Sequence, residues 1–155
     1  MSQPLAQGVF LLYNNVIEIF MMITLRPHQE KAQEAMDRYD IGQVIVPTGG
    51  GKTYVMIHDA IKTFYYSPVP KTIVVVAPRI LLANQLCAEF TEFITDADVA
   101  HVHSGETHYF STTKTEKLEK WYHNSTKNIL IFTTYHSLHK VKDSLDIEID
   151  TIYFD

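Results

Sequence analysis

The chain has 155 residues, enough for one domain of ordinary size and too few for two. Hydrophobic residues make up 46% of it and charged residues 20%, which is typical of globular proteins and excludes a disordered or fibrous chain. The net charge of −5 excludes a nucleic-acid binder that works by bulk positive charge. The single cysteine, Cys87, excludes an internal disulfide and Cys-rich zinc sites, so a reducing, cytoplasmic or other intracellular setting is expected.

Residues 1–23 form an apolar N-terminal segment whose pattern favours a β-hairpin or extension over a membrane anchor. A helix over its apolar stretch 9–23 would be about 22 Å long, short of the roughly 30 Å hydrocarbon core of a bilayer. Two β-rich runs flank Asn14-Asn15, a pair that tolerates the positive φ of a two-residue turn. The alternative is a natural start at Met21 or Met22. No contact with a membrane is expected.

From Thr24 onward the hydrophobic pattern alternates between helices and strands. Thr24 is expected to cap a helix that has Pro27 in its first turn and continues to about Tyr39. Uninterrupted apolar runs predict strands that are covered on both faces. Because such alternation produces βαβ units, the expected fold class is α/β with a mainly parallel sheet flanked by helices. The expected strands are 42–46, 72–77, 99–103, 129–132 and 149–154, and the other expected helices are 52–65, 81–93 and 115–122.

A glycine-rich segment joins the first expected strand to the helix that follows it. The strict phosphate-loop pattern fails at its first position, where Val46 stands in place of glycine. The physical requirement is still met, because three consecutive glycines let backbone N–H groups face an anion at a helix N-terminus. Lys52 would reach the β- and γ-phosphates, and the Thr53 hydroxyl would bind Mg²⁺. A glycine-rich turn before an ordinary lysine is the alternative, which the flanking strand and helix disfavour. The predicted nucleotide site consists of Thr48, Gly49, Gly50, Gly51, Lys52 and Thr53.

A site of this kind also needs a carboxylate at the end of a neighbouring apolar strand, where it holds Mg²⁺ through a water molecule. Asp155 follows the apolar residues Ile152 to Phe154 and has that position. A terminal Asp after apolar residues is unremarkable by itself, and its pairing with the loop at Lys52 gives it the functional interpretation. We therefore expect Asp155 beside Thr53 at the carboxyl edge of the sheet.

Two histidines raise the possibility of a metal site. His101 and His103 are expected on the same face of their strand, with His108 nearby. No carboxylate or cysteine at a suitable spacing completes a first shell of ligands, so a metal other than Mg²⁺ is not expected.

Together these motifs resemble the first motor domain of superfamily 2 helicases and translocases, which has a RecA-like fold and uses ATP and Mg²⁺. The resemblance covers about residues 24–155 and identifies them as a partial RecA-like ATP-binding domain. Leu25 to Gln29 resembles the adenine-recognition motif, which implies that Arg26 and Gln29 contact the base, although that family more often has an aromatic residue at the place of His28. Segment 47–53 matches motif I, and Ile152 to Asp155 matches the opening of motif II. These matches imply that Lys52 and Asp155 are catalytic.

Three further segments resemble the motifs by which this family holds a nucleic-acid strand, named Ia, Ib and Ic. They are expected on loops at the carboxyl ends of strands, where open α/β sheets place ligands. The contacts would use hydroxyls and main-chain N–H groups, which position a sugar–phosphate backbone without reading its sequence. DNA is expected rather than RNA, by analogy with the repair, restriction and phage recombination branches. The residues implied are Pro78 and Arg79 (Ia), Ser104 and Gly105 (Ib), and Thr134 and Tyr135 (Ic).

The resemblance also implies parts that these 155 residues do not contain. The family has a Glu directly after the motif II Asp, then motif III and a second RecA-like domain, and it clamps ATP between its two domains. We therefore expect a fragment cut within motif II, whose parent is an ATP-dependent helicase or translocase. The alternatives are a nucleotide-binding module without turnover, and the motor domain of an RNA helicase or of a restriction-enzyme translocase subunit. A P-loop kinase or GTPase would need a different base-recognition element from Arg26 and Gln29.

Overall fold

The computed structural model describes residues 23–47 and 49–155, so the expected N-terminal hairpin and Thr48 lie outside the described residues. The chain divides into two compact units, Met1–Tyr65 and Tyr66–Asp155, and each is described by itself. Within the described residues, no helix has the length and the apolar character that crossing a membrane would require.

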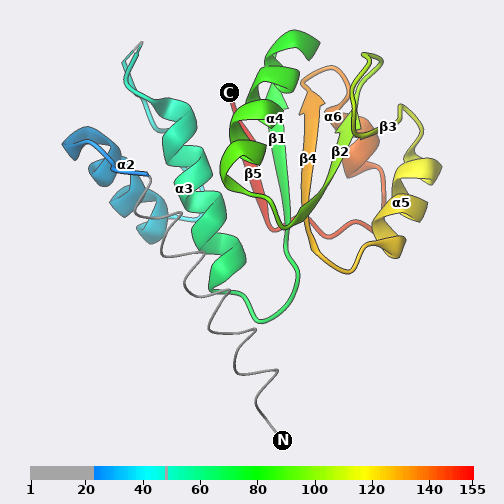
Figure 1. Ribbon diagram of the computed structural model, residues 1–155, viewed down its shortest axis with the longest axis horizontal. Helices are drawn as coiled ribbons and strands as arrows, with labels where there is room; N and C mark the ends of the chain where they lie inside the picture. The colour runs from blue at the N-terminus through cyan, green and yellow to red at the C-terminus, as the bar shows by residue number, and fades with distance from the viewer. Residues whose placement is uncertain (1–22, 48) are drawn as a thin grey trace, which may run out of the picture. The chain divides into compact units, whose positions relative to one another are not determined.

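The described part of the first unit holds two helices, α2 (Pro27–Arg38) and α3 (Lys52–Tyr65) (Figure 1). Helix α3 has the bounds that the sequence predicts. Helix α2 begins at Pro27, because the fixed φ of proline suits the first helical position. Its N-cap is Arg26 and not Thr24, so the expected cap is wrong. The cap position is stabilised by the side chain of Gln29, whose Oε1 accepts the Arg26 N–H at 2.7 Å.

The strand expected at 42–46 is absent from the described structure, and this prediction is wrong. The segment has no regular secondary structure, and the Ile45 side chain is 84% exposed. The prediction rested on the β-propensity of Val44, Ile45 and Val46. Propensity does not supply the neighbouring strand whose N–H and C=O groups a strand needs, and no described strand pairs with this segment.

The second unit contains a five-stranded, all-parallel sheet with the strand order β3-β2-β4-β1-β5 (Figure 1). Strand β4 pairs with β1 over its length, from Thr72 opposite Ile129 to Ala77 opposite Thr134. This is the predicted α/β fold class. The strands are β1 (Thr72–Ala77), β2 (Ala97–Val102), β3 (Phe110–Ser111), β4 (Asn128–Thr134) and β5 (Thr151–Phe154). The helices are α4 (Ile80–Phe93), α5 (Thr115–Asn124) and α6 (Leu138–Lys142).

Helices cover both faces of this sheet, which explains the uninterrupted apolar runs. On one face Phe90 of α4 meets Phe132 of β4 edge-on, with ring centroids 5.6 Å apart. On the other face Ile131 belongs to a buried cluster with Leu118 of α5 and Val141 of α6. All six residues of β1 are buried. The central strands β1 and β4 are therefore buried on both faces, which explains why both are rich in apolar residues.

Candidate nucleotide and nucleic-acid site

The predicted phosphate loop adopts a backbone that only glycine accommodates easily. Gly49 and Gly51 have φ angles of 77° and 75°, in the left-handed region. A Cβ on Gly50 would collide with Val46 and with the carbonyl oxygen of Pro47, and a Cβ on Gly51 would collide with the amide of Gln29. The Gly50 N–H donates to Pro47 O at 2.8 Å, which closes the turn. At each of the three positions, the backbone conformation or the lack of space for a Cβ therefore requires glycine.

Side chains at the start of α2 bind the carbonyl groups of this loop. Gln29 Nε2 donates to the carbonyl oxygens of Gly50 and Gly51, both at 3.0 Å. His28 Nε2 lies 2.8 Å from the Gly50 oxygen, and because a carbonyl can only accept, this nitrogen carries its proton. Arg26 contacts the Gly49 oxygen more loosely, at 3.4 Å.

These contacts fix the direction of the loop's N–H groups. In a planar trans peptide the C=O of one residue and the N–H of the next point in opposite directions. Since the carbonyls of Gly50 and Gly51 point at Gln29, the N–H groups of Gly51 and Lys52 point away from it. The loop is thereby preset to offer N–H donors on the side opposite α2, which is the arrangement that binds an anion.

Gln29 uses nearly all of its hydrogen-bonding capacity inside the first unit. Both amide hydrogens go to the loop, its oxygen accepts the Arg26 N–H, and the side chain is only 3% exposed. The resemblance assigns Gln29 to the adenine base. The sequence contains no signal for its contact with the loop, because that contact depends on how α2 packs on the glycines.

A polar network holds α2 against α3. Gln33 Nε2 donates to carboxylate oxygens of Asp37 and Asp59, at 3.1 and 3.0 Å, so its Oε1 faces His58 Nδ1 at 3.0 Å. Lys62 binds Asp37 at 2.8 Å. This hydrogen bond lowers the pKa of Asp37, while burial, and then the charge of Lys62, lower the pKa of His58. The network fixes the position of the helix that orients the loop.

The first turn of α3 has the chemistry of an anion site. It reads Lys52-Thr53-Tyr54-Val55 and carries no acidic residue to repel a phosphate. An anion there would meet the N-terminal end of a 14-residue helix, the Lys52 ammonium and the Thr53 hydroxyl.

In the second unit, the predicted nucleic-acid residues and Asp155 lie at or just after the carboxyl ends of four different strands. Because all strands are parallel, these ends lie along one edge of the sheet (Figure 1). The structure therefore brings together residues that are up to 77 positions apart, from 78 to 155. In sheet order they are Ser104 and Gly105 after β2, Thr134 at the end of β4 with Tyr135 after it, Pro78 and Arg79 after β1, and Asp155 after β5.

Two of these residues have contacts that sequence reasoning did not find. The Tyr135 hydroxyl donates to the backbone oxygen of Asp155 at 2.8 Å, and its ring stacks on Phe154 with centroids 5.9 Å apart. Thr134 is buried, and its hydroxyl oxygen accepts the Ser137 N–H at 3.3 Å. Arg79, Pro78 and Ser104 are exposed. Tyr135 therefore helps to hold the backbone at Asp155, in addition to any contact with a nucleic acid.

Lys52 and Thr53 belong to the first unit and Asp155 to the second. The expected approach of Asp155 to Thr53 therefore stays a prediction.

The described residues contain no group of three or more His, Cys, Asp or Glu side chains arranged to hold a metal ion. His101 and His103 do lie on one face, as predicted, and they hydrogen-bond to each other, with 2.9 Å between His101 Nδ1 and His103 Nε2.

The chain is similar to restriction enzymes. The family model described as "Type III restriction enzyme, res subunit" matches residues 22–155. No curated protein matches the chain significantly. One similar solved structure is a nuclease-deletion mutant of the Type ISP restriction-modification enzyme LlaGI in complex with a DNA substrate mimic, with 20% identity and a TM-score of 0.72. Another is the ATP-dependent Type ISP restriction-modification enzyme LlaBIII bound to DNA, with 21% identity and a TM-score of 0.65.

These matches differ in what they cover. The LlaGI match covers 85% of this chain and the LlaBIII match 83%, but the chain spans only 15% and 10% of the lengths of those two proteins. At such identities the structural likeness establishes the RecA-like fold. The family model covers most of the chain, and the chain therefore belongs to the Type III restriction enzyme res subunit family, as an N-terminal RecA-like domain of the superfamily 2 helicase type.

Proposed function

We propose that this chain is the ATP-binding part of an ATP-dependent helicase or translocase that acts on DNA, with ATP and Mg²⁺ as its cofactors. The observation that carries the proposal is the phosphate loop, whose carbonyls are held by Gln29 and His28 so that its N–H groups point to the other side. Membership of the restriction-enzyme family supports the proposal, and so does the similarity to LlaBIII, which is described as ATP-dependent and bound to DNA.

In this proposal the phosphates of ATP lie on the loop. The N–H groups of Gly51 and Lys52, which point away from Gln29, bind the phosphate oxygens. The Lys52 ammonium binds the β- and γ-phosphates and supplies the positive charge that phosphoryl transfer requires. Thr53 and Asp155 would hold Mg²⁺, which would supply positive charge to the phosphates. These roles of Lys52 and Asp155 are the catalytic ones.

The adenine base is assigned to the start of α2. Arg26 is exposed there and offers a planar guanidinium. Gln29 Oε1 accepts one hydrogen bond from the Arg26 N–H, and in this proposal its second lone pair accepts from the amino group of adenine. Gln29 would then contact the base and the loop at the same time.

A nucleic-acid strand is assigned to the carboxyl edge of the sheet. Exposed Pro78, Arg79 and Ser104 and the backbone near Gly105 and Thr134 would bind phosphates and sugars, with Tyr135 beside them. Few positioned contacts suffice, which is compatible with the net charge of −5. DNA is proposed because the proteins named LlaGI and LlaBIII are described with DNA.

Turnover would need a second RecA-like domain, which closes on ATP and stabilises the charge that develops on the transferred phosphoryl group. We therefore expect residues 1–155 alone to bind ATP and to hydrolyse it far below the usual enzyme range of about 1–10³ s⁻¹. Release of phosphate within that range by the purified chain would contradict this part of the proposal.

The test of the nucleotide site is the affinity for a fluorescent ATP analogue in the presence of Mg²⁺. Lys52→Ala should weaken binding by roughly 10- to 100-fold, since hydrogen bonds to charged groups contribute about 1.5–3 kcal/mol. Lys117→Ala removes the same group from an exposed position on α5 and should leave the affinity unchanged. Equal affinities for the wild type and Lys52→Ala would remove the assignment of the phosphate loop.

A further inference from the structure

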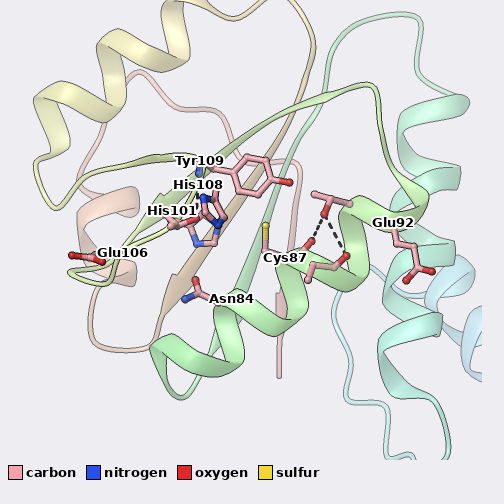
Figure 2. Close-up of a pocket in the computed structure, with 10 residues that line it drawn as sticks. Asn84, Cys87, Glu92, His101, Glu106, His108 and Tyr109 are labelled. Carbon is pink, nitrogen blue, oxygen red and sulfur yellow. Dashed lines mark hydrogen bonds between the residues drawn. The ribbon is translucent and has the colours of Figure 1, made fainter.

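A pocket of about 780 Å³ opens in the second unit, between α4 and the loop that follows β2 (Figure 2). Asn84 and Cys87 line it from α4, His101 lines it from β2, and Tyr109 lines it from the loop. None of its lining residues belongs to the nucleotide or nucleic-acid sites proposed above. The pocket is therefore a separate feature that needs its own explanation.

The protonation of the two buried histidines follows from their hydrogen bonds. The backbone N–H of Gly105 donates to His103 Nδ1 at 3.0 Å, so this nitrogen carries no proton. The proton of His103 is then on Nε2, which lies 2.9 Å from His101 Nδ1 and donates to it. His101 must therefore carry its own proton on Nε2. The chain from Gly105 through His103 leaves His101 as a neutral ring with one outward hydrogen-bond donor.

That donor and a nearby acceptor have no partner among the residues that the structure describes. His101 Nε2 and Asn84 Oδ1 are both buried and make no hydrogen bond there, and the His101 side chain is 1% exposed. Both side chains line the same pocket, His101 from β2 and Asn84 from α4 (Figure 2). Buried polar groups are normally satisfied, so this complementary pair in one pocket points to a ligand that accepts from His101 and donates to Asn84.

The other lining residues restrict the charge of such a ligand. The lining holds the carboxylates of Glu92 and Glu106 and the imidazole of His108, and no Lys or Arg of the described chain, so it disfavours a phosphate or carboxylate. Burial raises the pKa of the Cys87 thiol to about 12, so it adds no charge at neutral pH. The Tyr109 ring stacks on His101, with centroids 6.0 Å apart, and offers a flat apolar surface. The walls therefore suit a neutral, planar molecule.

We propose that this pocket binds a neutral, planar molecule with an amide-like edge, in which a carbonyl or ring-nitrogen acceptor lies next to an N–H donor. The acceptor takes the proton of His101 Nε2, and the N–H donates to Asn84 Oδ1. Carboxamides and the amino edges of free nucleobases share this chemistry. The inference does not depend on the proposed motor function.

The probes for the test are nicotinamide and cytosine, observed by side-chain ¹H–¹⁵N spectra of the histidines. Both probes should shift the His101 Nε2 resonance saturably, and inorganic phosphate should not. Asn84→Ala should weaken nicotinamide about tenfold, the loss typical of one hydrogen bond. Asn124→Ala, which removes the same group from the exposed end of α5, should leave the affinity unchanged.

A change in the ligand completes the test. N,N-dimethylnicotinamide keeps the carbonyl but has no amide N–H, so it should bind the wild type about tenfold more weakly than nicotinamide does. Its affinity for Asn84→Ala should equal its affinity for the wild type. Because Asn84 Oδ1 has no partner in the described structure, Asn84→Ala should not lower the melting temperature. The proposal is overturned if neither probe shifts His101 Nε2, if phosphate shifts it equally, if Asn84→Ala keeps wild-type affinity, or if Asn84→Ala melts clearly lower.

Discussion

The two units treat their buried polar side chains in opposite ways. In the first unit Gln29 uses both amide hydrogens and its oxygen within the chain, and this sets the phosphate loop before any nucleotide arrives. In the second unit the His103–His101 pair ends at His101 Nε2, a donor without a partner in the described structure. The acceptor Asn84 Oδ1 also has no partner there. A site whose buried polar groups are all hydrogen-bonded within the chain is rigid without its ligand. A site with buried polar groups that lack partners lowers the stability of the fold, and a ligand that binds those groups would restore it.

The substitution with the largest expected effect is Gly51→Ala, which should disrupt the phosphate loop held by Gln29. Alanine at a φ of 75° costs about 1–2 kcal/mol, and its Cβ would also displace the Gln29 amide from the loop. We expect binding of the ATP analogue to fall below detection. Gly42→Ala is the matched control, because Gly42 has no positive φ and its Cβ would meet nothing within 4 Å. Wild-type affinity in Gly51→Ala would show that the loop does not need this conformation.

Gln29→Glu tests whether Gln29 holds the loop or only recognises the base. A carboxylate of the same shape would face the carbonyls of Gly50 and Gly51 in place of an amide N–H, at a cost of about 2–3 kcal/mol. ATP and inorganic tripolyphosphate should therefore both bind more weakly, by about tenfold or more. Gln43→Glu makes the same change at an exposed residue and should bind both normally. Loss of affinity for ATP with unchanged affinity for tripolyphosphate would assign Gln29 to the base alone.

The sequence predicted regular elements where the residues themselves determine them. Helix α3 and strand β1 have the predicted bounds, because helical periodicity and a continuous apolar run are local signals. Strand β3 and helix α6, with two and five residues, are too short to carry a period and were not predicted. The strand at 42–46 failed because a strand also needs a partner.

The same division applies to the candidate sites. The sequence identified the glycines of the loop and placed His101 and His103 on one face of a strand. It could not predict the Gln29 contact with the loop, which depends on the packing of α2. Nor could it predict the direction of the His101 proton, which is set by the backbone N–H of Gly105 through His103. Both depend on tertiary geometry.

A lower pH should destabilise the second unit through His101. Burial, and then the nearby His103, lower the pKa of His101 from 6.5 to about 4. Between these two pKa values His101 is protonated in the unfolded chain but neutral in the folded chain. The free energy of unfolding is therefore highest above pH 6.5 and decreases as the pH falls toward 4. Between pH 7.5 and 5 the free energy of unfolding should drop by on the order of 1–2 kcal/mol in urea titrations.

The variant His101→Gln should remove the part of that pH dependence that comes from His101, while His103, whose pKa is also lowered by burial, keeps its own contribution. His136→Gln, at an exposed position, should retain the whole pH dependence. An identical pH dependence in His101→Gln and the wild type would show that other groups are responsible. Binding of nicotinamide at pH 7.5, where His101 is neutral, should increase the stability of the wild type further, since a ligand that binds the folded state alone stabilises it.

The smallest expected effect concerns the carboxyl edge of the sheet. Tyr135→Phe removes the hydroxyl that donates to the backbone oxygen of Asp155 but keeps the ring on Phe154. Since this bond is exposed to water, the free energy of unfolding should fall by only about 0.5–1 kcal/mol, measured by urea denaturation. Tyr39→Phe, at a residue that is 68% exposed, should change nothing. If the Tyr135 hydroxyl acts only inside the sheet, the affinity for a single-stranded oligonucleotide will not change. An affinity that falls several-fold while stability stays within this range would assign the hydroxyl to the nucleic acid.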